Sequence, residues 1–179
     1  MSQAMLLGGS EILRVCNSAD FDGTNDYMTR GGALTGAADG TQGILSCWFR
    51  LDGGDAGALK MLQIAIISAT SHLSIARWTD NKILLLGRAA DNTSLISAGS
   101  TSTFIQGATW HHVLAAWDIG AANVVRMYVD DVSEYVGVRA AAGDIDYTAD
   151  TSAGSNIDGT QKFNGCLAEL YFAQGTYLD

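Results

Sequence analysis

Proline is absent from this 179-residue sequence, and glutamate and lysine occur only three times each. Because Glu and Lys are good helix formers, their scarcity argues against a helical protein. The 21 glycines, without any proline, indicate many tight turns rather than a proline-rich linker or a disordered chain. The hydrophobic share of 47% suits one domain with a full-sized core.

Basic residues are also few, since ten Lys and Arg stand against nineteen Asp and Glu and leave a net charge of −9. Such a surface repels phosphate backbones, so we expect no nucleic-acid partner. No apolar stretch reaches a membrane-spanning length, and we expect no membrane insertion. The first residues lack the charged start and the long apolar run of a signal peptide. These features predict a chain that is made and folded in a cytoplasm.

Cysteine occurs three times, at Cys16, Cys47 and Cys166, without a CxxC motif or a Cys/His cluster. This wide spacing disfavours a zinc site. One disulfide bridge is an alternative, but we favour buried free thiols.

Short apolar runs alternate with clusters of turn residues along almost the whole chain. In GILSCWFRL (43–51), Leu45, Cys47 and Phe49 fall on one face, which is the period-two pattern of a strand. Regular short strands of this kind favour a β-sandwich or barrel. Segment 31–39 is ambiguous and can form a short helical turn, whereas we expect the second half of 55–68 to be a buried strand. The expected strands are 43–51, 62–68, 72–78, 82–88, 94–99, 110–117, 124–131, 134–138 and 163–173.

Five motifs occur in a characteristic order: FDGTNDYM (21–28), GILSCWFRLDG (43–53), TWHHVLAAWD (109–118), VRMYVDD (125–131) and KFNGCLAELYFA (162–173). Together they resemble the laminin-G-like, concanavalin A-like jelly-roll domain. The resemblance implies an all-β fold, an antiparallel two-sheet jelly-roll sandwich. It implies a single domain over 1–179, with the motif-bearing core at 20–173 and a lead-in strand or arm at 1–15.

More narrowly, the chain is similar to jelly-roll proteins encoded by phages and prophages near tail or virion genes. This likeness implies a non-enzymatic virion or tail-associated protein that acts as a structural, decoration or host-surface glycan-binding module. Its partners would be other virion proteins or copies of itself, and it would be made in the host cytoplasm. The alternative is a free-standing lectin-like domain that binds glycans with or without calcium and leaves the cell by a non-classical route.

Catalysis is disfavoured by the placement of the carboxylates. Glycosidases on this fold use paired carboxylates on one strand, and retaining hydrolysis needs them roughly 5 Å apart. The three glutamates are far apart in sequence, and Asp144 and Asp146 are expected to form a solvated edge. His111 and His112 are neighbours on a strand, so they point to opposite faces and are expected to pack or hydrogen-bond rather than share one site. We therefore expect no enzymatic activity.

A sugar-binding site would need an aromatic ring beside polar turn residues, because a ring stacks on the apolar face of a sugar. Trp78, Asp80 and Asn81 fit this pattern best, with Tyr147 and Tyr177 as weaker candidates. The alternative for Trp78 is to cover the end of the core.

The stretch DFDGTNDYM (20–28) is rich in carboxylates, but it is not an EF-hand. With Gly23 at the sixth loop position, the twelfth position is Thr29, which lacks the required bidentate carboxylate. Family resemblance allows a rim calcium site from Asp20, Asp22 and Asp26 with a distant ligand, Asp158 or Glu169. We favour a plain turn without metal, in which Glu169 pairs with Arg50 or another arginine, and we expect no required cofactor.

Two further expectations concern packing. Phe49, Val113, Met127 and Leu170 should lie on inward strand faces. Apolar runs such as LQIAIIS and KILLLG exceed what two buried faces need, and leftover apolar surface usually marks an interface. We therefore expect an oligomer or a docked protein with residues 60–100 in the contact.

Overall fold

The computed structural model describes residues 18–57, 60–67, 72–148, 150–156 and 159–178. The expected arm at 1–15 lies outside these residues. Within the described ranges the chain forms twelve β-strands and no helix. These residues therefore contain no helix that could span a membrane. The strands are β1 (Ala19–Asp22), β2 (Met28–Arg30), β3 (Gln42–Leu51), β4 (Lys60–Ile67), β5 (His72–Arg77), β6 (Lys82–Arg88), β7 (Ser94–Thr103), β8 (His111–Asp118), β9 (Val124–Val129), β10 (Val132–Gly137), β11 (Asp150–Ala153) and β12 (Asn164–Gln174).

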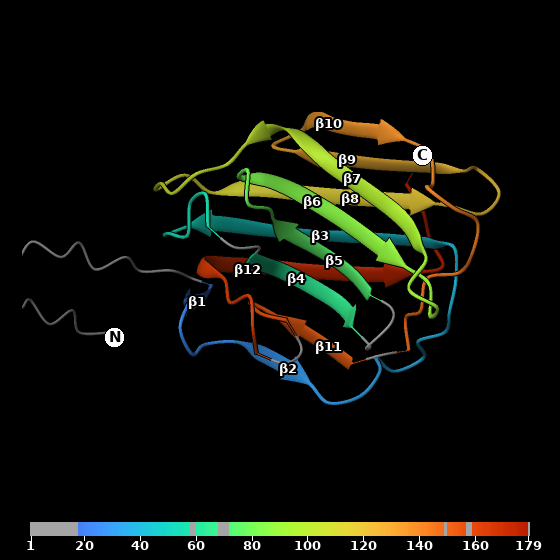
Figure 1. Ribbon diagram of the computed structural model, residues 1–179, viewed down its shortest axis with the longest axis horizontal. Helices are drawn as coiled ribbons and strands as arrows, with labels where there is room; N and C mark the ends of the chain where they lie inside the picture. The colour runs from blue at the N-terminus through green and yellow to red at the C-terminus, as the bar shows by residue number, and fades with distance from the viewer. Residues whose placement is uncertain (1–17, 58–59, 68–71, 149, 157–158, 179) are drawn as a thin grey trace, which may run out of the picture.

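The strands form two six-stranded sheets that lie face to face (Figure 1). The first sheet has the order β1-β12-β3-β8-β9-β10, and the second has the order β2-β11-β4-β5-β6-β7. Neighbouring strands are antiparallel throughout. The all-β, antiparallel jelly-roll sandwich expected from the motifs is therefore confirmed.

The core lies between the sheets because alternate side chains of each strand point inward. On β6, Ile83 and Leu85 are fully buried while the residues between them stay partly exposed. Phe49, Val113 and Met127 are also fully buried, as expected. Each sheet therefore keeps one face for the core and one face for solvent.

Leu170 was expected inside and is 36% exposed. The register between β12 and β3 shifts between Ala168 and Tyr171, and Glu169 adopts a positive φ of 51°. A β-bulge of this kind places an extra residue opposite one partner residue and changes the face on which later side chains lie. The expectation for Leu170 is wrong because the alternation of apolar and polar residues does not reveal where a bulge interrupts the strand.

Three short strands were not among the strand runs expected from alternation: β1 and β2 are edge strands, and β11 lies between β2 and β4. Their few residues give little periodic signal, although the first motif overlaps β1 and β2. Segment 31–39 forms turns rather than a helix, and the second half of 55–68 contains strand β4, as expected.

One polar contact joins the two sheets at an edge. Glu134 on β10 is buried, and one of its carboxylate oxygens accepts hydrogen bonds from the backbone N–H groups of Thr101 and Ser102 on β7, at 2.8 and 2.9 Å. Burial raises the pKa of this carboxyl group, but hydrogen bonds from Ser102 and Thr101 outweigh burial and leave the pKa below its usual value. The ionised carboxylate therefore stabilises the folded edge.

Candidate functional site

The turn between β5 and β6 presents Trp78 to solvent. The Trp78 N–H donates to the Lys82 carbonyl oxygen at 2.8 Å, and the Asn81 N–H donates to the Trp78 carbonyl oxygen at 3.0 Å. Asn81 has a φ of 65°, which asparagine tolerates better than most residues. Asp80 accepts a hydrogen bond from the Lys82 N–H at 3.2 Å. These bonds close a tight turn and leave the Trp78 side chain 42% exposed.

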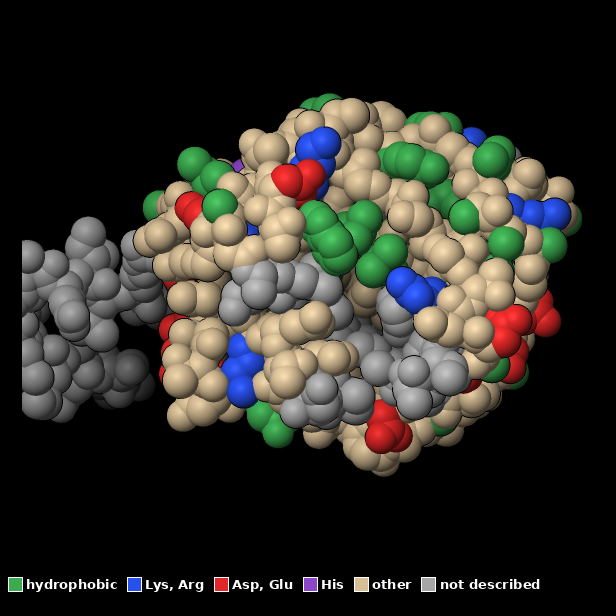
Figure 2. Space-filling view, in the orientation of Figure 1, with side chains coloured by type: hydrophobic (Ala, Val, Ile, Leu, Met, Phe, Trp, Pro, Cys, Tyr) green, Lys and Arg blue, Asp and Glu red, His purple; other side chains and the backbone are tan. Residues whose placement is uncertain are grey.

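A hollow of about 400 Å³ lies beside this turn on the outer face of the second sheet. Its floor comes from the outward residues of β6 and β7, which follow from strand alternation. Figure 2 shows hydrophobic side chains gathered near the centre of this face, with acidic and basic side chains around them. We call this hollow the β6–β7 groove, and it is lined by Trp78, Asp80, Lys82, Leu84, Leu86, Arg88, Ser97 and Gly99.

Gly99 helps to open the groove because it has no side chain opposite Leu84, its partner in the sheet. A Cβ atom at Gly99 would lie 3.8 Å from Leu84 Cδ1, an ordinary contact distance. A larger residue at this position would therefore enter the groove without a clash at its Cβ.

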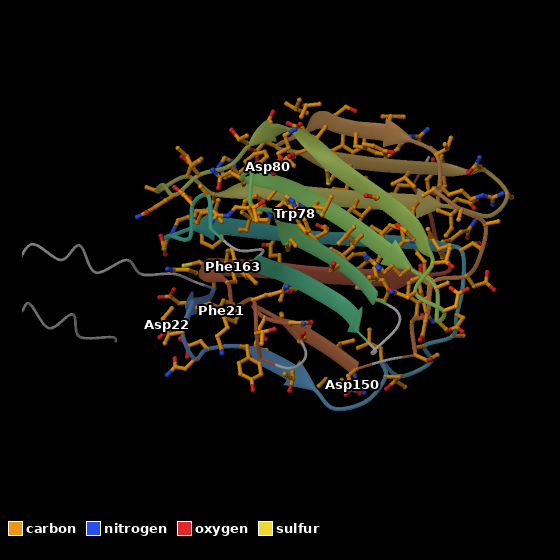
Figure 3. The ribbon with its side chains drawn as sticks, viewed as in Figure 1. Phe21, Asp22, Trp78, Asp80, Asp150 and Phe163 are labelled. Atoms are coloured by element: carbon orange, nitrogen blue, oxygen red, sulfur yellow. The ribbon has the colours of Figure 1, made fainter. Side chains whose placement is uncertain are left out.

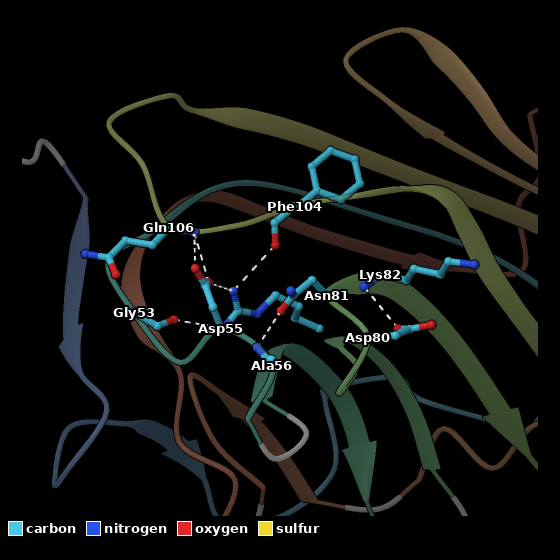
Figure 4. Close-up of polar contacts among 9 residues, drawn as sticks. Gly53, Asp55, Ala56, Asp80, Asn81, Lys82, Phe104 and Gln106 are labelled. Carbon is cyan, nitrogen blue, oxygen red and sulfur yellow. Dashed lines mark hydrogen bonds and ion pairs between the residues drawn. The ribbon is translucent and has the colours of Figure 1, made fainter.

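A buried arginine fixes the base of the Trp78 turn. Arg77 is 1% exposed, and its Nη1 donates to Asp55 Oδ1 at 2.6 Å while its Nη2 donates to the Gly53 carbonyl oxygen at 2.8 Å. Its Nη1 also lies 3.5 Å from the Phe104 carbonyl oxygen. Arg77, the residue that precedes Trp78, thereby ties the loop after β3 to the segment after β7 (Figure 4).

Two further contacts join the loop after β3 to its neighbours, one to the segment after β7 and one to the turn between β5 and β6. The Gln106 N–H donates to Asp55 Oδ1 at 3.0 Å, and the Ala56 N–H donates to Asn81 Oδ1 at 2.8 Å. Asn81 therefore holds the turn in place with both its backbone and its side chain. A site supported in this way is held rigid before any ligand binds.

The structure brings Trp78 and Asp80 together in the groove (Figure 3) and places Asn81 at its supporting turn (Figure 4). Tyr147 is fully buried instead. Its hydroxyl accepts a hydrogen bond from Trp117 Nε1 at 2.9 Å and donates to the Gln42 carbonyl oxygen at 3.1 Å, and burial raises its pKa. The expectation that Tyr147 offers its ring to a sugar is therefore wrong.

Lys82, Leu84, Leu86 and Arg88 were not singled out by the sequence. A signal for them was present, since alternation in KILLLGR puts these four residues on one face. Ser97 and Gly99 carried no such signal, because the register of β7 against β6 places them there.

The carboxylates near the chain start form the hydrogen bonds of a turn. Asp22 Oδ1 accepts from the N–H groups of Thr24 and Asn25 at 2.7 and 3.0 Å, and these bonds lower the pKa of Asp22. Asp26 Oδ2 accepts from the Asp22 N–H at 3.3 Å. In Figure 3 this turn lies away from Trp78 and Asp80.

The four residues considered for calcium do not come together. Asp22 pairs with Asn164 on β12, and Glu169 lies five residues further along that strand, roughly 17 Å at the usual rise. Glu169 is exposed at the bulge, and Asp158 lies outside the described residues. The favoured expectation, a plain turn without metal, stays a prediction.

Asp20 lies instead beside Asp52 and Cys166, whose donor atoms all fall within 4.8 Å of one another. Arg50 Nη2 donates to Asp52 Oδ2 at 2.9 Å and to Cys166 Sγ at 3.0 Å, so a guanidinium already supplies positive charge here. The expected pairing of Arg50 with Glu169 is wrong, because Asp52, two residues away, is within direct reach.

The cysteines differ from one another. Cys47 is a buried free thiol, as expected, and burial raises its pKa to about 12. Cys166 is disulfide-bonded, with its partner outside the described residues, so the expectation of a free thiol is wrong there.

The two histidines have separate packing roles, as expected. His111 Nδ1 lies 2.7 Å from Asp130 Oδ2, and its ring packs against Phe49 and Phe104. His112 Nε2 lies 2.8 Å from Ser46 Oγ on the outer face of the first sheet. They do not form one site.

The acidic pair Asp144 and Asp146 lies at the surface. Asp144 is exposed, and Asp146 Oδ1 accepts a hydrogen bond from the Thr148 N–H at 2.8 Å. This arrangement is the solvated edge that the sequence predicts.

Residues 22–176 match the sequence profile of the concanavalin A-like lectin/glucanases superfamily. Because this match covers most of the chain, the protein belongs to that superfamily. A search among curated proteins finds no significant sequence match.

Similar solved structures share the fold at low sequence identity. Domain 4 of AbnA, a GH43 extracellular arabinanase from Geobacillus stearothermophilus in complex with arabinotriose, has a TM-score of 0.69 and 17% identity over 90% of this chain and 72% of its own. The Ruminococcus gnavus IT-sialidase CBM40 bound to α2,3-sialyllactose has a TM-score of 0.55 and 10% identity over 80% and 91%. Mouse laminin α1 domains LG4-5 have a TM-score of 0.63 and 10% identity over 89% and 42%. At these identities the similarity shows a lectin-like jelly-roll fold.

Proposed function

We propose that this chain is a non-catalytic carbohydrate-binding module and that its ligand lies in the β6–β7 groove. The observation that carries the proposal is the half-exposed Trp78 ring beside a hollow of about 400 Å³. Ligand sites are typically concave and apolar with a few placed polar groups, and this groove has that composition.

The groove offers each contact that a sugar needs. An indole ring can stack on the apolar C–H face of a sugar ring. Asp80, Lys82 and Ser97 supply hydrogen-bonding groups at its sides, and Leu84 and Leu86 supply an apolar floor. Structures of the same fold that contain arabinotriose or sialyllactose support a glycan ligand for this chain.

The absence of catalysis belongs to the same proposal. Among the described residues that line the groove, Asp80 is the single carboxylate, whereas retaining hydrolysis needs two carboxyl groups roughly 5 Å apart. Glu134 is buried and hydrogen-bonded at the edge between the sheets, and Glu169 lies on the first sheet. We expect no release of reducing sugar from β-glucans, galactans or bacterial surface polysaccharide. Turnover that Asp80→Asn abolishes would overturn this expectation.

The binding test compares the wild-type protein with Trp78→Ala and Gly99→Val on an array of neutral and acidic glycans. We expect the wild-type protein to bind at least one glycan and both variants to lose that binding, because one removes the stacking ring and the other fills the groove. Trp48→Ala removes a comparable exposed ring from the other sheet and is the matched control. Binding that survives Trp78→Ala and Gly99→Val but is lost in Trp48→Ala would place the ligand elsewhere.

We further propose that the module belongs to a phage virion or tail, where it serves as a structural, decoration or host-surface-binding protein. The motif-level likeness to phage jelly-roll proteins supports this role, and a glycan groove suits attachment to a bacterial surface. Its partners there would be other virion proteins or further copies of the chain. Mass spectrometry of purified particles tests the proposal, which expects the chain in the particles at a fixed ratio to tail or capsid proteins. A chain found free in the medium would favour the free-standing lectin.

A further inference from the structure

We infer that the β6–β7 groove selects acidic glycans, whose sugars carry carboxylates, over neutral glycans of the same backbone. This inference rests on the proposed function and adds the class of ligand. It follows from the two cationic side chains that line the groove, neither of which forms an ion pair with a described residue of the protein.

The groove is a cationic site on an acidic protein. The whole chain has a net charge of −9, yet Lys82 and Arg88 line the groove against one carboxylate, Asp80. The remaining lining side chains are uncharged. A local excess of positive charge in a concave, partly apolar site attracts anions more strongly than the same charge on an open surface.

The Lys82 ammonium group does not form an ion pair with Asp80. The Asp80 carboxylate accepts from the Lys82 backbone N–H at 3.2 Å, so this contact uses the backbone of Lys82 and not its ammonium group (Figure 4). Within the part of the chain that the structure describes, the Lys82 ammonium makes no ion pair. Its charge is therefore available to a ligand in the groove.

Arg88 is held in place without being neutralised. Its Nη1 donates to the neutral Asn92 Oδ1 at 2.7 Å, which orients the guanidinium at the far end of β6. Its buried Nε has no hydrogen-bond acceptor, and no described carboxylate forms an ion pair with it. A guanidinium matches the planar geometry of a carboxylate, so this end of the groove favours a carboxylated sugar over a hydroxyl group.

The two cations stand at opposite ends of one apolar floor. Lys82 and Arg88 are the first and last residues of β6, six positions apart, which is roughly 20 Å at the usual strand rise. Leu84 and Leu86 lie between them, and Gly99 keeps the space above them open. This spacing fits an extended oligosaccharide with more than one acidic group better than a single sugar.

Matched glycan pairs test the inference, because the members of a pair differ in charge alone or chiefly in charge. We would measure dissociation constants by calorimetry for oligogalacturonides and for 3′-sialyllactose, each against its own carboxyl methyl ester. The wild-type protein should bind the acidic member of at least one pair about tenfold more tightly, and added salt should narrow that difference. Equal affinity for both members of every pair that binds would overturn the inference while leaving glycan binding intact.

The variant Lys82→Gln/Arg88→Gln removes both cations and should abolish the preference while changing the affinity for a neutral glycan less than about twofold. The control Arg30→Gln/Lys162→Gln changes the net charge equally at residues outside the groove and should keep the preference. An equal loss of preference in both double variants would mean that overall charge, and not the groove, selects the ligand. Failure of the wild-type protein to bind any member of a full glycan array would overturn the proposed function itself.

Discussion

Each outer face of the sandwich carries a half-exposed tryptophan, Trp78 on the second sheet at 42% and Trp48 on the first at 38%. Trp48 lies in the middle of β3 and packs its ring on His112, with ring centroids 4.9 Å apart. Trp78 lies at the end of β5 beside the β6–β7 groove. The first ring already has a partner in the protein, whereas the second ring borders an open space.

A hollow exists on the first sheet as well, at about 320 Å³, and it also contains a cation, Arg126. Here the C-terminal residues supply the partner. Arg126 Nη1 donates to the Tyr177 hydroxyl, and the guanidinium lies 5.6 Å from the centre of the Tyr177 ring. The difference between the faces shows that an exposed ring and a hollow are not sufficient to indicate a site. The groove stands out because two cations, Lys82 and Arg88, flank one apolar floor there, and neither forms an ion pair with any residue that the structure describes.

The largest expected loss of stability comes from a substitution in the core, on which both outer faces depend. Phe49 is fully buried against the Phe104 and His111 rings. Phe49→Ala should lower the free energy of unfolding by about 3–5 kcal/mol because it leaves a cavity. Urea unfolding measures this loss, and Trp48→Ala on the adjacent position should cost less. A loss below about 1 kcal/mol for Phe49→Ala would contradict the burial of this ring.

The next largest loss of stability should differ between the two sheets, and it is tested by replacing one arginine on each, Arg77 and Arg126. Arg77→Met removes a buried guanidinium and leaves Asp55 without its charged partner, which should cost about 2–3 kcal/mol. Arg126→Met removes a partly exposed contact and should cost less than about 1 kcal/mol. The Arg77 variant should also weaken glycan binding, because the Trp78 turn loses its anchor. Equal costs for the two variants would contradict the special role of Arg77.

A smaller effect concerns the ring that borders the groove. Trp78→Ala should lower glycan affinity about tenfold, which is typical of a buried aromatic anchor, and change stability by less than about 1 kcal/mol. Trp48→Ala should leave glycan affinity unchanged. The measurement is a calorimetric titration of each folded variant, with circular dichroism as the control for folding. Loss of binding in the Trp48 variant would reverse the assignment of the two faces.

Lowering the pH should destabilise the contact between β10 and β7, where Glu134 joins the two sheets. Because the folded-state pKa of Glu134 is lowered, its stabilising contribution is fully present above the usual glutamate pKa of about 4.3 and is lost as the pH falls through the folded-state value. Glu134→Gln should reduce stability at neutral pH by about 1–2 kcal/mol and flatten the stability profile on the acid side. Unfolding curves between pH 3 and pH 7 provide the measurement. An unchanged acid slope in this variant would show that other carboxylates govern the profile.

The smallest effect is expected at the opening turn. Asp22 already accepts two backbone hydrogen bonds, so millimolar calcium or a chelator should leave the melting temperature unchanged. A rise with calcium that Asp22→Ala removes would reveal a metal site there. A rise that the variant keeps would point to another part of the chain.

Much of the fold could be predicted, because it depends on patterns that neighbouring residues carry. Alternation in β3, β8 and β9 gives both the strand and its inward face, and it identifies Phe49, Val113 and Met127 as core. The site was predicted in part, since Trp78 and Asp80 belong to one turn and could be recognised together. Tyr147 could not be placed, because its burial depends on Trp117 and Gln42, which are distant in sequence.

The sequence by itself determined an all-β sandwich, the strand faces and the turn chemistry of Trp78, since each of these depends on residues within a few positions of one another. The tertiary structure decided which contacts form between distant residues: the bulge at Glu169, the choice of Asp52 as the partner of Arg50, and the anchoring of Arg77 by Asp55. It also opened the groove, because strand register sets Gly99 opposite Leu84. Register depends on the turn that joins two strands and on which faces the sheets bury together, and alternation within a single strand does not give it.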